Sequence, residues 1–305
     1  MSQKTENIIE KLRKKFDGKE EQISTRLSGL LHARDITYWD YIHTEALLSL
    51  QQPRTNFPDE MVFVIYHQIT ELYFKLILWE INHFFQIKEE LANALLKCFN
   101  RITRYFDALS QSFTIMKNGM ELEQYLQFRD TLTPASGFQS FQYRLIELQS
   151  THPKNLVELS LRNVDHLNPK NLLDKLYWQS AGKTSNQKEK SPLLTNFLEK
   201  YGNSLQKTLN DSYQGKNLWN AYLQLSEKDK KNTNLIEKMK HFDKTVNITW
   251  VISHYQTAKQ YIGTGAATGG SDWQKYMHPA YQKRIFFPDL YSKKEIESWG
   301  QDQKL

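Results

Sequence analysis

Two histidines that lie far apart in the sequence are the residues best suited to chemistry. His67 lies in a long apolar run, and His254 precedes the segment 268–271, which begins Thr-Gly-Gly. Between them the sequence places a phenol at Tyr125 and a guanidinium at Arg129, one helical turn apart. A planar guanidinium binds a carboxylate through two hydrogen bonds. Together these groups are suited to hold an iron cofactor and a zwitterionic aromatic substrate.

The spacing of the histidines argues against a metal ion held by several side chains. The sequence has no pair of histidines or cysteines at the close spacing of such sites. A haem needs only one protein ligand, so a haem is not excluded. Each histidine also has a simpler interpretation, because a single histidine on an apolar helix is more often a hydrogen-bonded core residue than a ligand.

Neighbouring residues admit competing interpretations. Phe63 lies four residues before His67, so a helix directs both side chains into the same space. Arg129 has an alternative role in an ordinary ion pair, with Asp130 as the nearest partner. The glycine-rich segment 263–271 superficially resembles a phosphate-binding loop, but it lacks the Lys-Ser/Thr ending and no strand precedes it. Its glycines are better explained by close approach of the backbone to a ligand.

Composition is typical of a globular protein that keeps its thiols reduced. The 305 residues suffice for one large domain or two smaller ones. The single cysteine, Cys98, excludes an internal disulfide and suits the cytoplasm, and its simplest role is a small buried apolar residue. The net charge of +6 comes from lysines spread among acidic and polar residues, so we expect no nucleic-acid partner.

Two segments bear on membrane association. The first residues are polar and charged, without the apolar region of a secretory signal. The most apolar stretch, 61–81, is interrupted by polar or charged side chains at Gln68, Glu71, Lys75 and Glu80. This favours a buried helix of a globular protein over a transmembrane helix. We therefore expect no membrane partner.

The elements that must position these residues are almost entirely helices, since few segments alternate strictly and glycines are sparse before residue 260. The predicted helices cover 6–17, 35–50, 59–88, 89–118, 121–131, 139–148 and 234–260, with more within 193–225. Residues 179–192 are predicted to form an exposed loop or a disordered polar insertion. Because the two histidine helices lie on either side of it, we predict a single all-α domain, a helical bundle, over 1–305, with 1–50 as an N-terminal segment.

Several separated segments resemble the tryptophan 2,3-dioxygenase family. They are Tyr38-Trp-Asp-Tyr41, Leu47-Leu-Ser-Leu-Gln-Gln-Pro53, Asp59-Glu60, Phe63 to Lys75, Tyr125 to Asp130, Ser136-Gly-Phe-Gln-Ser140 with Gln142-Tyr-Arg144, His254 with Thr268-Gly-Gly-Ser271, and Phe286-Phe-Pro288. The resemblance runs from about residue 36 to residue 292 and is weakest across 150–240. One departure is Pro58, which stands where many members have a histidine; proline fits the first turn of a helix.

The resemblance implies a domain that encloses one b-type haem per subunit, with His254 as the axial ligand of the iron. It implies that His67 has a catalytic role on the distal side, near the indole N–H, and that Phe63 lines the substrate pocket. Arg129, helped by Tyr125, is implied to pair with the substrate carboxylate.

Further substrate contacts are implied by the same resemblance. Thr268 is expected to contact the ammonium or carboxylate group, and the loop at Ser136 and Gly137 is expected to close over the site. Members of the family are homotetramers with intertwined N-termini, so Tyr38 and Tyr41 are expected to reach the site of a neighbouring subunit. The N-terminal segment then contributes contacts between subunits.

The implied reaction joins L-tryptophan and O₂ to give N-formyl-L-kynurenine, the first step of tryptophan catabolism by the kynurenine pathway. A haem-dependent aromatic amino-acid hydroxylase of the same superfamily, a haem-based sensor and a non-catalytic helical scaffold remain alternatives. The presence of Tyr125, Arg129 and Thr268 favours an amino-acid enzyme over a sensor, because a sensor needs no group that binds a carboxylate.

Overall fold

The computed structural model describes residues 2–16, 23–132, 139–162, 164, 168–183, 189–263 and 278–301. Within these ranges the regular elements are helices, and β-structure is limited to the isolated bridges Val157–Leu176 and Lys183–Lys190. The predicted all-α class is therefore confirmed. The chain divides into two compact units, Met1–Gln51 and Gln52–Leu305, and each is described by itself.

The first unit consists of four short helices: α1 (Gln3–Phe16), α2 (Ile23–His32), α3 (Tyr38–Ile42) and α4 (Thr44–Leu48). None of them has a buried residue. The single helix predicted over 35–50 is wrong, because His43 adopts a left-handed conformation with φ of 57° and separates α3 from α4. The Thr37 side chain caps α3 by accepting a hydrogen bond from the Asp40 N–H.

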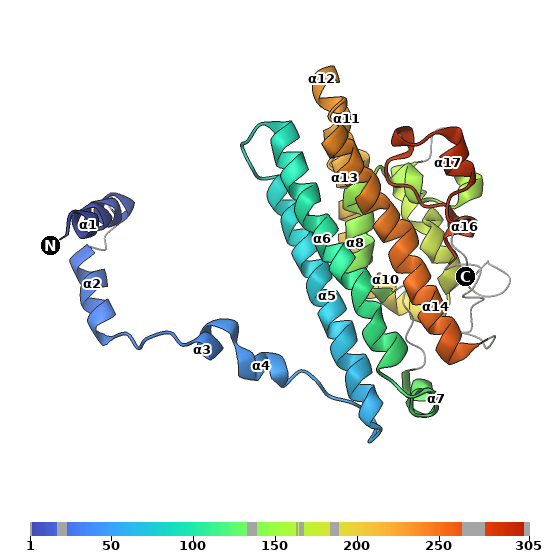
Figure 1. Cartoon of the computed structure of the whole chain (residues 1–305), viewed down its shortest axis with the longest axis horizontal. Helices are drawn as coiled ribbons and strands as arrows, with labels where there is room; N and C mark the ends of the chain where they lie inside the picture. Colours follow the sequence, from blue (N-terminus) through green and yellow to red (C-terminus); the bar gives the residue numbers. More distant parts are fainter. Residues whose placement is uncertain are drawn as a thin grey trace. The chain divides into compact units, whose positions relative to one another are not determined.

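The second unit is built around long helices (Figure 1). The longest are α5 (Pro58–Phe84), α6 (Leu91–Asn118) and α10 (Pro192–Tyr213), together with α13 (Thr233–Lys244), a π-helix (Thr245–Thr249) and α14 (Trp250–Ile262), which follow one another without a loop. The shorter helices are α7 (Leu122–Arg129), α8 (Phe141–Ser150), α9 (Pro169–Leu172), α11 (Leu218–Leu223), α12 (Glu227–Lys230), α16 (Pro279–Gln282) and α17 (Lys293–Glu297). α6 packs against α5 on one side and against α13 and α14 on the other.

Local sequence explains where the long helices begin. α5 starts with Pro58 and has Asp59 and Glu60 in its first turn, where carboxylates favour the positive end of the helix dipole. Glu60 is buried and accepts hydrogen bonds from the backbone N–H groups of Arg54 and Thr55, at 2.8 and 2.7 Å. Its carboxylate therefore holds the chain that enters α5 against the first turn of that helix.

Apolar side chains form two clusters that matter for the site. The main core includes Phe74, Ile77 and Ile81 of α5, Phe99, Ile102 and Phe106 of α6, and Met239 and Phe242 of α13. The second cluster joins α5, α6, α7 and α14 through Tyr66, Phe113, Met116, Met120, Tyr125, Phe128 and Tyr261, with Phe63 and Trp250 packed against it. His67 and His254 each contact aromatic rings of this second cluster.

The prediction of an exposed polar insertion at 179–192 is wrong for its first residues. Gln179, Ser180 and Gly182 are buried in a 3₁₀-helix, Tyr177–Gly182. The Ser180 hydroxyl donates a hydrogen bond to the Glu158 carboxylate, so a polar side chain is satisfied inside the fold. The neighbouring Trp178 also draws the segment inward by packing its ring against Phe197. Residues 184–188 lie outside the described residues.

Candidate active site

Phe63 fixes the orientation and the tautomer of His67. The two rings are 4.0 Å apart, and the His67 Nδ1 lies 2.7 Å from the Phe63 carbonyl oxygen. Since a carbonyl oxygen can only accept, Nδ1 is the donor, and in the neutral ring Nε2 keeps its lone pair. Burial among protein atoms lowers the pKa of His67, although the hydrogen bond to Phe63 and the charge of Glu71 oppose this. His67 is therefore a neutral acceptor at pH 7, and part of its surface remains accessible.

His254 is also held neutral, on α14. Burial lowers the pKa of its imidazole to about 4, and the nearby His67 contributes to this shift. Its ring stacks on Phe113, with centroids 5.8 Å apart and planes inclined by 25°. Trp250, one turn earlier on the same helix, lies 5.8 Å from it. A neutral imidazole that is partly accessible among aromatic rings is a good ligand for a transition metal.

Aromatic rings link the two histidines across three helices. Tyr66 of α5 meets His67 edge-on at 5.9 Å and lies 5.8 Å from Phe113 of α6. Phe113 in turn stacks on His254 of α14. The structure thus brings together two side chains that are distant in the sequence, close enough for one to influence the pKa of the other.

Tyr125 and Arg129 share one face of α7, as their spacing predicts. A hydrogen bond links the two side chains, and the guanidinium charge lowers the pKa of the Tyr125 phenol, although burial has the larger effect and raises it overall. The Tyr125 ring lies 6.3 Å from Phe63 and 4.8 Å from Tyr261. The guanidinium is therefore carried beside the aromatic surface that also holds His67.

The start of α5 fixes the position of α7. The Asp59 carboxylate accepts a hydrogen bond from the Glu121 N–H at 2.6 Å, and the Gln124 side-chain oxygen accepts one from the Asp59 N–H at 3.3 Å. Arg54 adds a third link by donating to the Thr131 carbonyl oxygen at 2.8 Å. These contacts set the distance between the cation of α7 and the histidine of α5.

Glu71, one turn after His67, anchors the start of α8. Its carboxylate accepts hydrogen bonds from the Ser140 hydroxyl and the Gln142 amide, both at 2.7 Å. Gln142 also donates to the Glu71 carbonyl oxygen at 2.8 Å. The chain that leads into α8 is thereby tied to the same part of α5 that carries His67.

The remaining predicted site residues are not brought to this site by the described structure. Ser136, Gly137 and Thr268 lie outside the described residues. Tyr38 and Tyr41 lie on α3 of the first unit, where both rings are exposed. Their roles stay predictions.

Trp250 and Phe113 are candidate site residues that the sequence did not single out. Trp250 contacts Phe74, Phe113 and Tyr143 as well as His254, and its buried indole N–H has no hydrogen-bond partner among the described residues. The sequence feature that could have indicated Trp250 is its position one helical turn before His254, on the same face of the helix. Aromatic residues at helical spacing are usually core, so the pattern alone could not distinguish them.

The donor set fits a haem. Neutral His254 supplies one nitrogen ligand, the surrounding rings supply an apolar wall, and among the described residues no group of three or more His, Cys, Asp or Glu is arranged to hold a metal ion. The π-helix Thr245–Thr249 directly precedes Trp250, and π-helical turns often occur at functional sites. A b-type haem ligated by His254 is therefore compatible with the residues present.

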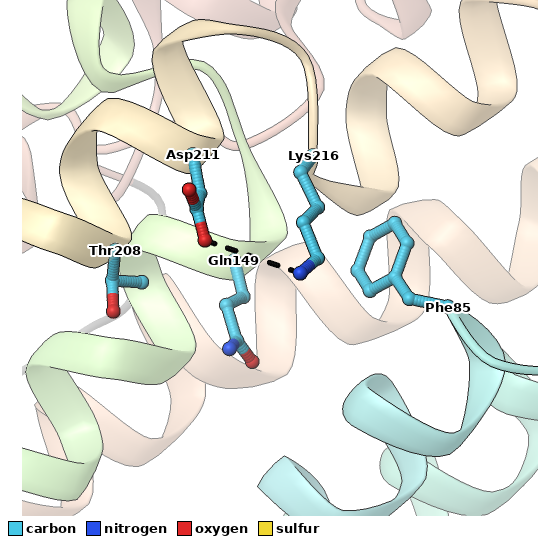
Figure 2. A pocket seen from close by; sticks show the side chains of 5 residues that line it. All are labelled: Phe85, Gln149, Thr208, Asp211 and Lys216. Atoms are coloured by element: carbon cyan, nitrogen blue, oxygen red, sulfur yellow. Dashed lines mark ion pairs between the residues drawn. The ribbon is translucent and has the colours of Figure 1, made fainter.

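A separate small cavity is not part of this site. It has a volume of about 30 Å³ and is lined by Phe85, Gln149, Thr208, Asp211 and Lys216, where the Lys216 ammonium lies 3.9 Å from the Asp211 carboxylate (Figure 2). A cavity of this size holds about one water molecule.

Comparisons with known proteins identify the family of this chain. Residues 28–218 match the family model described as tryptophan 2,3-dioxygenase. Tryptophan 2,3-dioxygenases of Bacillus thuringiensis subsp. konkukian (strain 97-27) and Bacillus anthracis are each 30% identical, over 270 and 268 residues, and the matches cover 85% of this chain and 91% of each relative. The tryptophan 2,3-dioxygenase of Sorangium cellulosum (strain So ce56) is 42% identical over 129 residues, which cover 38% of this chain and 30% of that relative.

The extent of these matches decides the classification. The family model covers more than half of the chain and includes His67, Tyr125 and Arg129. A match over 85% of the chain extends well beyond that model toward the C-terminus. The chain belongs to the tryptophan 2,3-dioxygenase family of oxidoreductases.

Proposed function

We propose that this protein opens the indole ring of L-tryptophan with O₂ to give N-formyl-L-kynurenine, using one haem b per subunit. The observation that carries the proposal is the pair of neutral histidines, His67 of α5 and His254 of α14, which the contact between Tyr66 and Phe113 links. The phenol and guanidinium of Tyr125 and Arg129 lie beside the same aromatic surface. Family membership supplies the reaction class.

His254 is the proposed ligand of the haem iron, with Phe113 and Trp250 against its ring. When bound, the haem activates O₂ for addition across the C2–C3 bond of the indole, and both oxygen atoms enter the product. The low pKa of His254 keeps its nitrogen free of a proton at neutral pH, so the iron does not compete with a proton for the ligand.

His67 is proposed to orient the indole ring. Its Nδ1 is committed to the Phe63 carbonyl oxygen, so its Nε2 is the atom that accepts the indole N–H. Because the accepting nitrogen is fixed by a bond on the far side of the ring, the imidazole needs no reorganisation when the substrate binds. Phe63 and Tyr66 pack on the His67 ring and hold its orientation.

Arg129 is proposed to select the amino-acid end of the substrate by pairing with its carboxylate, with Tyr125 holding the guanidinium. Ser136, Gly137 and Thr268 are proposed to complete this end of the site. Tyr38 and Tyr41 are proposed to reach the site of a neighbouring subunit in a homotetramer; the apolar side chains that the first unit exposes, among them Leu30 and Leu31, support an intermolecular role. We also propose a cytoplasmic location.

Two measurements test the function together. Ultraviolet–visible spectra of the purified protein should show the Soret band of haem. Product analysis after incubation with O₂ should show N-formyl-L-kynurenine from tryptophan and no hydroxylated product from tyrosine. Hydroxylated tyrosine would instead identify an aromatic hydroxylase, and haem without turnover of either amino acid would identify a sensor.

A further inference from the structure

The last turns of α14 meet α7, the short helix that carries Tyr125 and Arg129. α7 packs against both α5 and α14, at the end of the second unit where α6 finishes (Figure 1). Tyr261 of α14 is 4% exposed, and the centre of its ring lies 4.8 Å from that of Tyr125. Tyr261 is therefore packed against the phenol that is proposed to hold the Arg129 guanidinium.

α5 contributes only one of its sides to the support of α7. By length and composition α5 could cross a membrane, and one of its sides packs against α6, α7 and α8. Elsewhere on the helix, Leu72 and Trp79 are 47% and 68% exposed. The expectation of a buried helix at 61–81 is therefore wrong for the side that carries these two residues.

The hydroxyl group of Tyr261 holds the turn that leads into α7. It lies 2.7 Å from the Met116 carbonyl oxygen and 3.0 Å from the Met120 carbonyl oxygen, and it is the only donor among these three groups. Met116 belongs to the last turn of α6, where the carbonyl groups have no partner within the helix, and Met120 comes two residues before α7 begins. One side chain thus joins the end of α6 to the start of α7.

The same turn is also held from the side of α5. The Asp59 carboxylate accepts a hydrogen bond from the Glu121 N–H at 2.6 Å. Burial, together with the charge of Asp59, raises the pKa of the Tyr261 phenol, so this phenol keeps its proton at neutral pH and remains a donor. Gln260, next to Tyr261, adds a hydrogen bond to the Lys117 carbonyl oxygen at 2.9 Å. The turn is therefore fixed between α5 and α14.

These contacts determine where Arg129 lies. Arg129 is the last residue of α7, and Tyr125 bonds to its side chain from one turn earlier. Tyr261 holds α7 near its start through the hydroxyl group and at its middle through the ring, and a helix that is held at two points places its last residue precisely. Tyr261 also lies seven residues after His254, on the same face of α14. The helix that carries the proposed iron ligand thus also places the guanidinium.

We propose that Tyr261 is a positioning residue for substrate selection, which holds α7 so that Arg129 meets the carboxylate of the amino acid. The proposal rests on the role proposed above for Arg129 and adds the residue that places its guanidinium. Displacement of α7 should weaken the binding of tryptophan, which has a carboxylate, more than the binding of tryptamine, which has none.

Steady-state kinetics of the full-length haem protein with both substrates test this role. Tyr261→Leu removes both contacts and should lower the preference for tryptophan over tryptamine, measured as the ratio of kcat/KM values, by more than about tenfold. A displacement of about 1 Å in a group that positions a substrate costs up to about a hundredfold. KM for tryptophan should rise more than kcat falls, because Arg129 pairs with the carboxylate before the chemical step as well as during it.

Tyr261→Phe separates the two contacts of the side chain. It keeps the ring on Tyr125 and removes the hydroxyl group that holds the turn. It should lower the preference for tryptophan by about 2- to 10-fold, the range expected for one neutral hydrogen bond, and should therefore recover part of what Tyr261→Leu loses. If Tyr261→Leu does not fold, Tyr261→Phe decides the question.

Tyr222 on α11 is the matched control. It is 6% exposed, its ring stacks on Trp219 with centres 5.3 Å apart, and its hydroxyl group donates to the Lys230 carbonyl oxygen at 3.0 Å. Tyr222 thus makes the same kinds of contact as Tyr261, but in the main core and away from the site. Tyr222→Leu and Tyr222→Phe should leave the preference for tryptophan over tryptamine unchanged, as would changes at Tyr261 if its role were only structural.

Hydrogen exchange, measured by mass spectrometry on the same samples, gives a readout that does not depend on turnover. The Tyr261 variants should speed up the exchange of the α7 amides, and the Tyr222 variants should not. The proposal is overturned if α7 exchanges at the wild-type rate in both Tyr261 variants. It is also overturned if both variants keep the wild-type preference for tryptophan while Arg129→Ala loses it.

The controls distinguish this proposal from the proposed function. If Arg129→Ala keeps the preference for tryptophan, the carboxylate role of Arg129 is wrong, and the role of Tyr261 in selection falls with it. If Arg129→Ala loses the preference and the Tyr261 variants keep it, only the role of Tyr261 is wrong. The product formed from tryptophan by the wild type tests the reaction separately from both.

Discussion

His67 donates its Nδ1 hydrogen to the Phe63 carbonyl oxygen, 2.7 Å away and one turn earlier on α5. This bond leaves only Nε2 to meet a substrate, and it makes that nitrogen an acceptor. The backbone of α5 thus determines that Nε2 is the nitrogen of His67 that can accept a hydrogen bond from the indole N–H. The role of His67 can be tested by removing either member of the proposed hydrogen bond.

His67→Ala should lower kcat/KM for tryptophan by only about 2- to 12-fold, since one neutral hydrogen bond contributes about 0.5–1.5 kcal/mol. The matching substrate is 1-methyltryptophan, which has no indole N–H. Wild type should prefer tryptophan over it, and the variant should lose the part of that preference that comes from the hydrogen bond. If the variant prefers tryptophan over 1-methyltryptophan as strongly as wild type does, His67 does not form a hydrogen bond with the indole N–H.

Arg129→Ala should be more damaging than His67→Ala. Truncation of a buried guanidinium that pairs with a carboxylate costs on the order of 2–5 kcal/mol, or roughly thirty- to several-thousand-fold in kcat/KM. Arg129→Lys should also be impaired, because lysine keeps the charge but loses the planar pair of donors. Tryptamine, which lacks the carboxylate, is the control: Arg129→Ala should lose most of the preference for tryptophan over tryptamine. If the variant keeps that preference, the carboxylate binds elsewhere.

His254→Ala should purify with little haem and without activity, because the variant removes the proposed iron ligand. The measurement is the Soret absorbance per polypeptide, with far-ultraviolet circular dichroism to verify that the helices persist. His241→Ala is a suitable control, since His241 lies on α13 and contacts Asp107 at 2.9 Å rather than the site rings. Full haem loading with an unchanged ferrous spectrum in His254→Ala would assign the ligand to another residue.

The haem-free protein should lose stability as the pH falls from about 6.5 to about 4. Burial lowers the pKa of His254 to about 4, whereas a histidine in the unfolded chain titrates near 6.5. Between these values the unfolded state binds the proton and the folded state does not, so the contribution is complete above pH 6.5 and falls with the pH. The resulting loss of unfolding free energy between pH 6.5 and pH 4 is on the order of 3 kcal/mol.

The contribution of Asp243 to stability changes with pH in the opposite direction to that of His254. The effect of His254 must therefore be measured by comparing two proteins that both keep Asp243. Burial raises the pKa of its carboxyl to about 6, so protonation in this range favours the folded state. Urea unfolding of wild type and His254→Phe at pH 7, 6, 5 and 4 isolates the histidine, because Asp243 is common to both proteins. If the unfolding free energy has the same pH dependence in the two proteins, His254 does not cause the loss of stability.

Glu147→Gln should destabilise the fold by about 3–5 kcal/mol. The Glu147 carboxylate is fully buried and pairs with Arg144 at 2.9 Å and Arg284 at 2.7 Å, so the variant leaves two guanidinium groups buried without their counter-charge. Glu89→Gln is the control, because Glu89 pairs with Lys97 at an exposed position and should change stability by less than about 1 kcal/mol. Urea unfolding measures both, and equal effects would show that the buried network adds little.

Helical periodicity predicted most of the second unit. The long helices at 59–88, 89–118 and 234–260 are observed as α5, α6 and the continuous run from α13 to α14. Their apolar residues recur at helical spacing over many turns, so the signal is strong. The helix α2 was not predicted, and the break at His43 has no signal in the sequence, because a left-handed conformation at a histidine depends on its surroundings.

The site was predictable only where its residues are near one another in the chain. Tyr125 and Arg129 interact as their spacing indicates. The buried network of Arg144, Glu147 and Arg284 joins segments more than a hundred residues apart, and nothing in the local pattern marks it. For the same reason only the resemblance to a family joined His67 to His254.

The π-helix Thr245–Thr249 limits which length changes the chain tolerates. A π-helical turn holds one residue more than an α-helical turn, so deletion of one residue there should convert it into α-helix and leave the flanking helices continuous. Because the π-helical turn makes about the same rotation with its extra residue as an α-helical turn makes without it, that deletion should leave His254 and Trp250 facing Phe113. Deletion of one residue between Trp250 and His254, where the helix is α-helical, would instead turn His254 away from Phe113 by about 100°. The π-helical turn therefore tolerates the loss of a residue that the first turn of α14 does not.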